Sequence, residues 1–277
     1  MADAPFEIRI TGLRKAFGRQ VVLDGVDMDV RRGEVVAVVG GSGCGKTVLL
    51  NHVLGMLDPD AGRVQVADHD APGQPLVDLA SLDEGEIDRL HRHWGMVFQR
   101  NALFSGSVYD NLALWLREVR EMDDAAIAPV AQRSLAAVAL PTDPAFLDRD
   151  VNDLSGGMAK RLAVARAISM APQMIFYDEP TTGLDPASSA QIHDLIAATH
   201  EAGAGPGDGA GGGPRTTVII THDKDLLRRL RPRIVMLHQG KVFFDGTLAA
   251  FEANDSPIVR PYFELMPVLH GRPGAGA

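Results

Sequence analysis

The chain has 277 residues, of which 45% are apolar and 23% charged, ordinary values for a globular enzyme subunit. Its formal net charge of −9 argues against a nucleic-acid-binding protein, because such proteins usually present a basic face. The single cysteine, Cys44, cannot form an internal disulfide, which suits a reducing compartment. With no apolar run near the roughly 18–20 residues that span a bilayer and no signal-peptide pattern, we expect a soluble chain that reaches membranes through a partner.

Short alternating segments open the chain. Residues 6–10 and 26–30 alternate apolar and polar side chains, as half-buried strands do, and in the second we expect Val26, Met28 and Val30 to face inward. A third alternating segment, residues 63–66, follows a turn rich in Asp, Pro and Gly. Together they predict a small antiparallel sheet.

A glycine-rich loop follows the apolar run at residues 35–39. Its G-x-x-x-x-G-K-[ST] spacing is that of a P-loop, here Gly40-Gly41-Ser42-Gly43-Cys44-Gly45-Lys46-Thr47, with Val48 next. Small residues let backbone N–H groups surround phosphate oxygens, and a helix beginning near Lys46 adds the positive end of its dipole. Lys46 can reach the β- and γ-phosphates, and the Thr47 hydroxyl can bind Mg²⁺. The loop predicts a nucleoside triphosphatase.

Helical periodicity dominates from residue 107 to about residue 170, with a break at residues 140–144. Within it, Leu154-Ser155-Gly156-Gly157-Met158 opens a helix. Ser155 is a good N-cap, and Gly156 and Gly157 expose the N–H groups of the first turn. The segment predicts a second anion site, although by itself it also fits an ordinary capped helix.

Two short apolar runs, residues 174–177 and 216–220, predict buried strands of a parallel sheet. The first ends in Asp178, which can hold Mg²⁺ through its water shell, and Glu179, which can deprotonate a water in line with the γ-phosphate. The second run leads to His222 at the same edge of the sheet.

The last third of the chain carries three further signals. Residues 203–214 are rich in glycine and predict a flexible surface loop. Residues 235–244 alternate around Gln239-Gly240 and predict a hairpin. Residues 271–277 predict a frayed end.

The P-loop, Leu-Ser-Gly-Gly, Asp-Glu-Pro and a downstream Thr-His-Asp occur in that order, and the chain resembles the ABC transporter ATPases over roughly residues 6–247. The resemblance implies an α/β fold, with a P-loop NTPase (RecA-like) core, a parallel sheet, a flanking antiparallel β subdomain and an inserted helical subdomain. We expect the core and β subdomain in residues 1–98 and 173–247, the helical subdomain in 99–172 and a C-terminal extension in 248–277, with a flexible end.

The same resemblance implies roles for single residues. Gln99, at the end of a short strand expected at residues 96–99, contacts Mg²⁺ and the attacking water, and His222 contacts the γ-phosphate. Phe17 stacks on adenine, and Asp185 in Gly183-Leu184-Asp185 crosses a dimer interface. Two copies associate head to tail around two ATP molecules with Mg²⁺. In that dimer Ser155, Gly156 and Gly157 of one copy close over the ATP held by the other copy's P-loop.

Three short segments resemble the Mla/Mce-type lipid-transport ATPases in particular: Met158 in place of the usual glutamine, residues 99–118, and residues 256–263. After Gln99 the chain has Arg100-Asn101 where those proteins usually have Ser-Gly. The resemblance implies transport of phospholipid or a related lipid, a permease docked from Asn101 to Tyr109, a lipid-binding Mce-type partner, and a place on the cytoplasmic face of the inner membrane.

Two alternatives stay open. The ATPase of a polar-solute (amino-acid) importer shares every catalytic motif. A soluble, non-transport ABC ATPase of translation or DNA repair is disfavoured, because this chain has one cassette, no heptads and no cysteine ligands. A cassette that binds ATP without hydrolysing it is disfavoured by the presence of Glu179 and His222.

Overall fold

The computed structural model describes residues 5–203 and 214–266. The loop predicted at residues 203–214 lies outside them except for its two ends, and the frayed end predicted at 271–277 lies outside them entirely. Within those two ranges, every helix is too short or too polar to cross a membrane.

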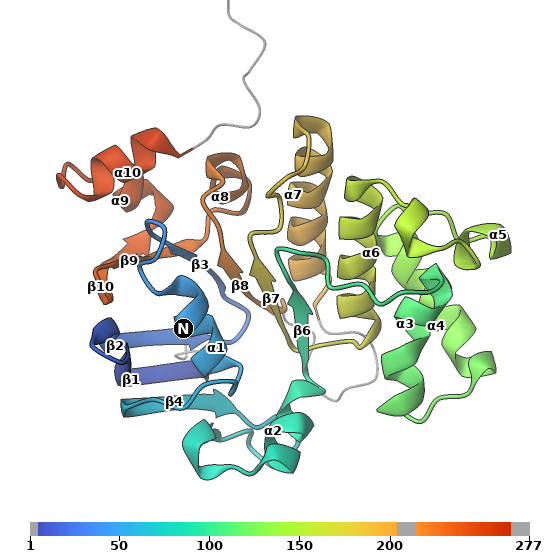
Figure 1. Ribbon diagram of the computed structural model, residues 1–277, viewed down its shortest axis with the longest axis horizontal. Helices are drawn as coiled ribbons and strands as arrows, with labels where there is room; N and C mark the ends of the chain where they lie inside the picture. Colours follow the sequence, from blue (N-terminus) through green and yellow to red (C-terminus); the bar gives the residue numbers. More distant parts are fainter. Residues whose placement is uncertain (1–4, 204–213, 267–277) are drawn as a thin grey trace, which may run out of the picture.

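Six strands form the main sheet, in the spatial order β10-β9-β3-β8-β7-β6 (Figure 1). Five of them run parallel: β3 (Val35–Val39), β6 (Trp94–Val97), β7 (Met174–Asp178), β8 (Thr216–Ile220) and β9 (Arg233–His238). β10 (Lys241–Thr247) pairs antiparallel with β9 around Gln239-Gly240, which confirms the predicted hairpin. β3, β7 and β8 are nearly continuous apolar runs because both faces of the sheet are covered.

A second sheet is antiparallel, as predicted, and its strands have the spatial order β2-β1-β4-β5. Its strands are β1 (Phe6–Phe17), β2 (Gln20–Arg31), β4 (Ala61–Ala67) and β5 (Leu76–Asp78). Val26, Met28 and Val30 are buried as expected. β1 and β2 are longer than the alternation predicts, because register shifts between Ile10 and Leu13 interrupt the pattern without ending the pairing.

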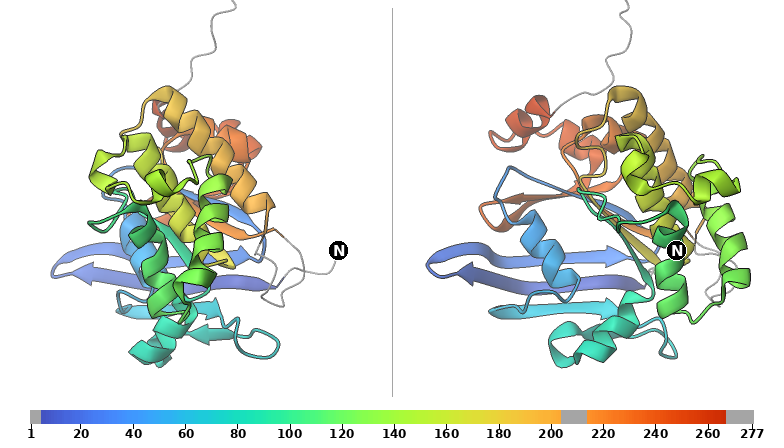
Figure 2. Two further views of the ribbon diagram at one scale, coloured as in Figure 1. Left: turned by 90° about the vertical axis from the view of Figure 1, so that its right-hand side faces the viewer. Right: turned by 45° about the vertical axis from the view of Figure 1, so that its right-hand side comes forward.

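Helix α1 (Lys46–Val53) shares one hydrophobic cluster with both sheets, through Leu49, Leu50 and Val53. Figure 2 shows the antiparallel strands as a separate layer beside the main sheet. On this side lie also α2 (Glu84–His91) and the short 3₁₀ turn η1 (Leu79–Ser81). The P-loop at the start of α1 is therefore held between two layers.

Four helices group on the β6 side of the sheet (Figure 1). They are α3 (Val108–Glu118), α4 (Asp124–Ala137), α5 (Pro144–Leu147) and α6 (Gly156–Ser169), with the 3₁₀ turn η2 (Val151–Asp153) before α6. This confirms the predicted helical region and its break. The limits drawn for the subdomains stay a prediction, since one hydrophobic cluster continues from Leu112 and Leu162 to Tyr177 of β7.

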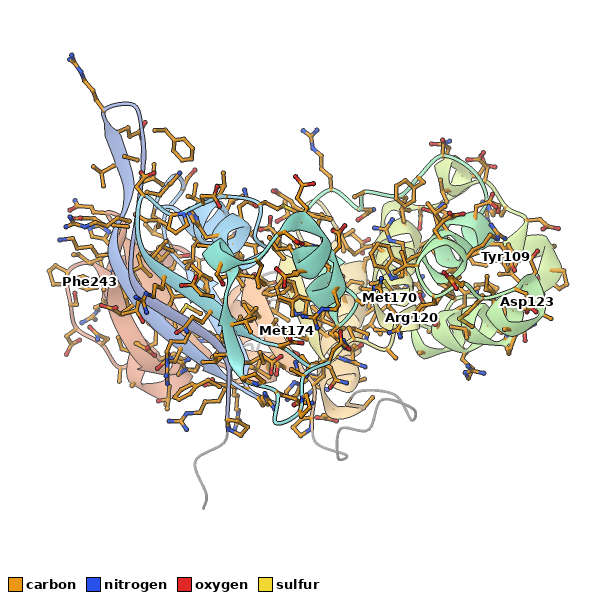
Figure 3. All side chains as sticks on the ribbon, turned by 90° about the horizontal axis from the view of Figure 1, so that it is seen from below. Tyr109, Arg120, Asp123, Met170, Met174 and Phe243 are labelled. Carbon is orange, nitrogen blue, oxygen red and sulfur yellow. The ribbon has the colours of Figure 1, made fainter. Side chains whose placement is uncertain are left out.

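Figure 3 shows the molecule from below, with Tyr109 on the helical side and Phe243 of β10 at the opposite end. Arg120 Nη2 donates to the Met170 carbonyl at 3.2 Å, which joins the end of α3 to the end of α6. The remaining helices are α7 (Pro186–Glu201), α8 (Lys224–Leu230), α9 (Leu248–Glu252) and α10 (Val259–Leu265). Phe251 of α9 and Val259 of α10 are fully buried in a cluster with Val39 and Met236.

Candidate active site

The P-loop leaves β3 through Gly40, whose φ of 148° favours glycine. A Cβ there would collide with the Leu237 carbonyl oxygen and lie 2.6 Å from Cys44 Sγ. Gly45, at φ 104°, ends the loop, and a Cβ would lie 2.7 Å from Leu23 Cδ2. Both glycines are therefore required by close backbone approach, as in a loop that wraps a ligand with its N–H groups.

Helix α1 begins at Lys46, and its N-cap Gly45 supplies no side-chain hydrogen bond. The first-turn N–H groups therefore lack a side-chain cap, which leaves them available to an anion at the positive end of the helix dipole. Lys46 Nζ lies across the loop and donates to the carbonyls of Gly40 at 2.7 Å and Gly41 at 3.1 Å. Gly41, Ser42, Gly43 and Thr47 are exposed. The cradle fits a triphosphate.

Asp178 ends β7 and lies half-buried. Burial raises the pKa of its carboxyl and Glu179 adds to the effect, while Lys46 and Lys160 oppose it. A carboxylate that its surroundings make costly to ionise is stabilised by a bound cation. The oxygen donors of Asp178 and Thr47 are those that Mg²⁺ prefers, so the residues fit this metal ion.

Glu179 follows with a φ of 48°, in the left-handed region, and its N–H donates to the Ile220 carbonyl at 2.9 Å. Such a backbone conformation is costly for a non-glycine residue and persists only where the surroundings impose it. The Glu179 side chain is 14% exposed, and its Oε2 lies 2.7 Å from His222 Nδ1. The structure therefore brings together Glu179, predicted as the general base at the end of β7, and His222, predicted to contact the γ-phosphate after β8.

His222 is half-exposed, and its hydrogen bond to Glu179 raises the pKa of its imidazole. The next residue, Asp223, is buried and fixes this segment in three ways. It accepts hydrogen bonds from the Leu226 N–H at the start of α8 and from Thr181 Oγ1 at 2.8 Å, and its Oδ2 lies 2.7 Å from His193 Nε2. Sequence reasoning assigned Asp223 no role, although it stands in the Thr-His-Asp motif.

Gln99 lies two residues beyond β6 and is exposed. The strand ends at Val97, so the prediction that it runs to Gln99 was wrong by two residues. Lys160 of α6 holds this segment, because its Nζ donates to the carbonyls of Phe98 at 3.0 Å and Gln99 at 2.9 Å. Lys160 is only 2% exposed, and burial lowers its pKa to about 8. Nothing in the sequence indicates that Lys160 holds the Gln99 segment, because the two residues are 61 positions apart in the chain.

Ser155 is the N-cap of α6, as predicted, and its Oγ accepts from the Met158 N–H at 3.3 Å. A Cβ on Gly157 would lie 2.8 Å from Ser188 Oγ, so Gly157 is needed for close contact with α7. Asp185 is the N-cap of α7 and accepts hydrogen bonds from Ser188, which lower the pKa of its carboxyl. Ser155 and Gly156 are exposed.

Not all of the predicted residues form one cluster. Helices α1 and α6 lie on different sides of β7 and β8, so the Ser155 helix end is separated from the P-loop of the same chain (Figure 1). Phe17 ends β1 and is 50% exposed, with Lys15 Nζ 5.8 Å from its ring centroid, so it is not a core residue. Its hairpin leads to Val22 and Leu23, which touch Gly45 of the P-loop.

An apolar groove of about 460 Å³ lies beside Gln99, between the main sheet and the helical group. Side chains from several elements line it, among them Met56, Met96, Phe98, Phe104, Leu114 and Trp115. Phe104 is 53% exposed and Met56 59%, which is unusual for large apolar side chains. Arg166 of α6 donates to the Ala102 carbonyl at 2.7 Å and lies 5.4 Å from the Phe104 ring, so the wall of the groove is fixed.

The sequence model of a family described as "ABC transporter" matches residues 23–182. Protein TRIGALACTOSYLDIACYLGLYCEROL 3, chloroplastic, of Arabidopsis thaliana is 34% identical over 272 residues, which cover 94% of this chain and 74% of that protein. The intermembrane phospholipid transport system ATP-binding protein MlaF of Haemophilus influenzae is 32% identical over 241 residues, covering 87% and 83%.

The L-cystine transport system ATP-binding protein TcyN of Escherichia coli is as similar, with 32% identity over 262 residues that cover 93% of this chain and 97% of TcyN. Among solved structures, the dimeric, post-hydrolysis ATP-binding cassette MJ0796 bound to ADP and Pi superposes with a TM-score of 0.70 and 26% identity, covering 87% of this chain and 98% of that one. The predicted fold class is confirmed.

Proposed function

The chain belongs to the ABC transporter family, and on that premise we propose that it powers the transport of phospholipid or a related lipid through a separate membrane permease. It is the ATP-binding subunit of a transporter, and it hydrolyses ATP with Mg²⁺ as cofactor. The observation that carries the catalytic part is the pair of Glu179 and His222, 2.7 Å apart beside the P-loop.

In this proposal each predicted site residue keeps a role that its position supports. Glu179 takes the proton of a water, and His222, hydrogen-bonded to it, contacts the γ-phosphate and holds the carboxylate in place. Lys46 leaves the loop carbonyls to bind phosphate oxygens, and Asp178, Thr47 and Gln99 hold the metal ion, directly or through water. When bound, Mg²⁺ supplies electrostatic stabilisation of the charge on the phosphoryl group. Phe17, exposed beside the P-loop, stacks on the base.

The proposed active form is a head-to-tail dimer of this chain. Ser155 and Gly156 are exposed at the start of α6 and lie away from their own P-loop, so they remain available to a second copy. A dimer in which each α6 faces the partner's P-loop gives each ATP two anion sites. The similarity to the dimeric cassette MJ0796 supports this arrangement. Asp185, at the start of α7 next to Gly157, would lie at the same interface.

The lipid cargo is supported by the names of two relatives, one a phospholipid transport ATP-binding protein and one named after a glycolipid. It is also supported by Met158 and by residues 256–263, which resemble lipid-transport ATPases. TcyN, named for L-cystine transport, has the same identity as MlaF, so an amino-acid importer is the second candidate. A lipid-binding Mce-type partner on the far side of the permease, and a place on the cytoplasmic face of the inner membrane, belong to the first candidate.

The permease docks, in this proposal, in the groove beside Gln99, on the predicted segment from Asn101 to Tyr109. The groove is apolar and open, so a short amphipathic helix of the permease fits it. Trp115 Nε1 is buried there and has no hydrogen-bond partner within the described ranges of the chain.

A charge in the groove tests the docking surface. Phe104→Asp should abolish stimulation of hydrolysis by the permease and leave basal hydrolysis within about twofold, because a buried charge opposes docking alone. The matched control is Phe243→Asp, which changes an equally exposed phenylalanine at the other end of the molecule (Figure 3). Equal loss of stimulation in both variants would refute this surface.

The cargo is tested in proteoliposomes that contain the full chain with the permease that co-purifies with it. We expect ATP-driven movement of a fluorescent phospholipid between membranes or leaflets, absent in a Glu179→Gln variant. Parallel vesicles receive radiolabelled L-cystine. ATP-driven L-cystine movement without phospholipid movement would overturn the lipid proposal and establish the second candidate, while leaving the ATPase unchanged.

A further inference from the structure

The C-terminal helix α10 touches the P-loop through Tyr262. The Gly40 N–H donates to the Tyr262 hydroxyl at 3.0 Å, and the same hydroxyl donates to the Gly40 carbonyl at 3.3 Å. A tyrosine 222 positions away therefore satisfies both polar groups of the first residue of the loop. A hydroxyl can accept and donate at once, which an apolar or charged side chain of this shape cannot.

Tyr262 is half-buried, and burial raises its pKa to about 12, so the hydroxyl keeps its proton at physiological pH. Its position is fixed by its neighbours in α10. Val259 is fully buried, and the Phe263 ring packs edge-on against Phe251 with centroids 5.8 Å apart. Lys224 Nζ of α8 lies 4.3 Å from the Phe263 ring centroid. The helix is therefore packed against the fold rather than lying loose on it.

Gly40 is tightly enclosed, since a Cβ there would collide with the Leu237 carbonyl oxygen and with Cys44 Sγ. Its carbonyl has two donors, Lys46 Nζ and the Tyr262 hydroxyl. When Lys46 moves to a phosphate, Tyr262 is the donor that stays. Without the Tyr262 hydroxyl, the Gly40 N–H would lose this acceptor and the Gly40 carbonyl would lose its remaining donor. The loop would then sample more conformations.

We propose that Tyr262 is a positioning residue for the P-loop, so that docking of the C-terminal helix sets the affinity of the chain for nucleotide. The inference rests on the proposed function, because the loop it positions is the proposed ATP site. On this inference the C-terminal extension regulates the chain, because a partner that displaces α10 from the fold would weaken nucleotide binding without contacting the nucleotide.

The test compares full-length Tyr262→Phe with wild type. Removing the hydroxyl leaves the ring and its packing, and a lost hydrogen bond of this kind corresponds to about a two- to tenfold change in an equilibrium constant. We expect the Kd for a fluorescent ATP analogue and the KM for ATP to rise by that factor, with kcat changed less than twofold. In the nucleotide-free protein, amide hydrogen exchange should quicken in peptides that contain Gly40.

The control is Tyr177→Phe, the same chemical change at a fully buried tyrosine that packs in the hydrophobic cluster of Leu162 and Ile192. It should leave the Kd and the exchange of Gly40 peptides as in wild type. Unchanged nucleotide affinity and unchanged exchange in a folded Tyr262→Phe protein would overturn the inference alone. A wild-type protein that fails to bind ATP would instead overturn the proposed function.

Discussion

Replacing Lys160 by methionine removes a buried ammonium group from the contact between α6 and the Gln99 segment. The lost hydrogen bonds to the Phe98 and Gln99 carbonyls involve a charged donor, each contributing about 1.5–3 kcal/mol. The variant also escapes the cost of burying the charge. Because the pKa falls from 10.5 to about 8 at about 1.4 kcal/mol for each pH unit, this cost is roughly 3 kcal/mol. At pH 7 we therefore expect a net loss of only about 0–3 kcal/mol.

The pH dependence separates these two contributions. Between pH 8 and 10.5 the unfolded chain holds a proton on Lys160 that the folded chain has released, so the stability of the folded protein rises with pH in that window. The variant lacks this gain. Its stability deficit relative to wild type should therefore grow by roughly 3 kcal/mol from pH 7.5 to pH 10.5.

Urea unfolding of both full-length proteins across that pH range measures the deficit. Lys241→Met, which removes an exposed lysine that pairs with Asp24, serves as the control, because its stability deficit relative to wild type should not grow with pH. A Lys160→Met deficit that is equally constant with pH would refute the reasoning that Lys160 is buried at a cost.

Three further predictions concern the acid–base and phosphate residues. Glu179→Gln should lower turnover by about 10²–10⁴-fold while ATP binding persists in a filter or fluorescence assay, and near-normal hydrolysis would remove Glu179 from its role. Lys46→Ala should lose nucleotide affinity, and an unchanged Kd would contradict the P-loop assignment. The hydrogen bond to Glu179 raises the pKa of His222 in the folded protein above 6.5; the charge of Asp223 adds to this effect, and Lys46 opposes it. The stability that the His222–Glu179 pair provides is therefore complete below pH 6.5 and is lost as pH rises through the folded pKa. The gap in Tm between wild type and His222→Ala should accordingly shrink from pH 6 to pH 9, and a gap that widens would contradict the pairing.

Residues whose function depends on local sequence were predictable. The P-loop glycines, the carboxylates after β7 and the serine cap of α6 lie where the pattern indicates, because turn geometry, strand ends and helix caps are set by neighbours within a few positions. The antiparallel sheet was predicted in outline. The full length of β1 was not, since register shifts after Ile10 break the alternation although the pairing with β2 continues to Phe17.

Residues that act across the fold were not predictable. In the sequence Lys160 looks like an ordinary polar residue of a helix. Its two acceptors are backbone carbonyls, which every residue has and which no sequence pattern marks. Tyr262 likewise bonds a glycine peptide 222 positions earlier. Trp115 lines the groove, but nothing in its neighbouring sequence distinguishes it from an ordinary core or surface tryptophan. The groove itself exists only once α3, α6 and β6 are packed together.

Phe98 and Gln99 are neighbours in the chain, yet one forms a wall of the apolar groove and the other is a proposed ligand of the metal ion. Their carbonyls share a single clamp, the Lys160 ammonium group. A membrane subunit seated in the groove would therefore press on the hydrolytic centre across one peptide bond. Coupling between the groove and the proposed metal site would then need no chain of intermediate residues. Its strength would depend on how firmly the Lys160 hydrogen bonds hold the Phe98–Gln99 peptide.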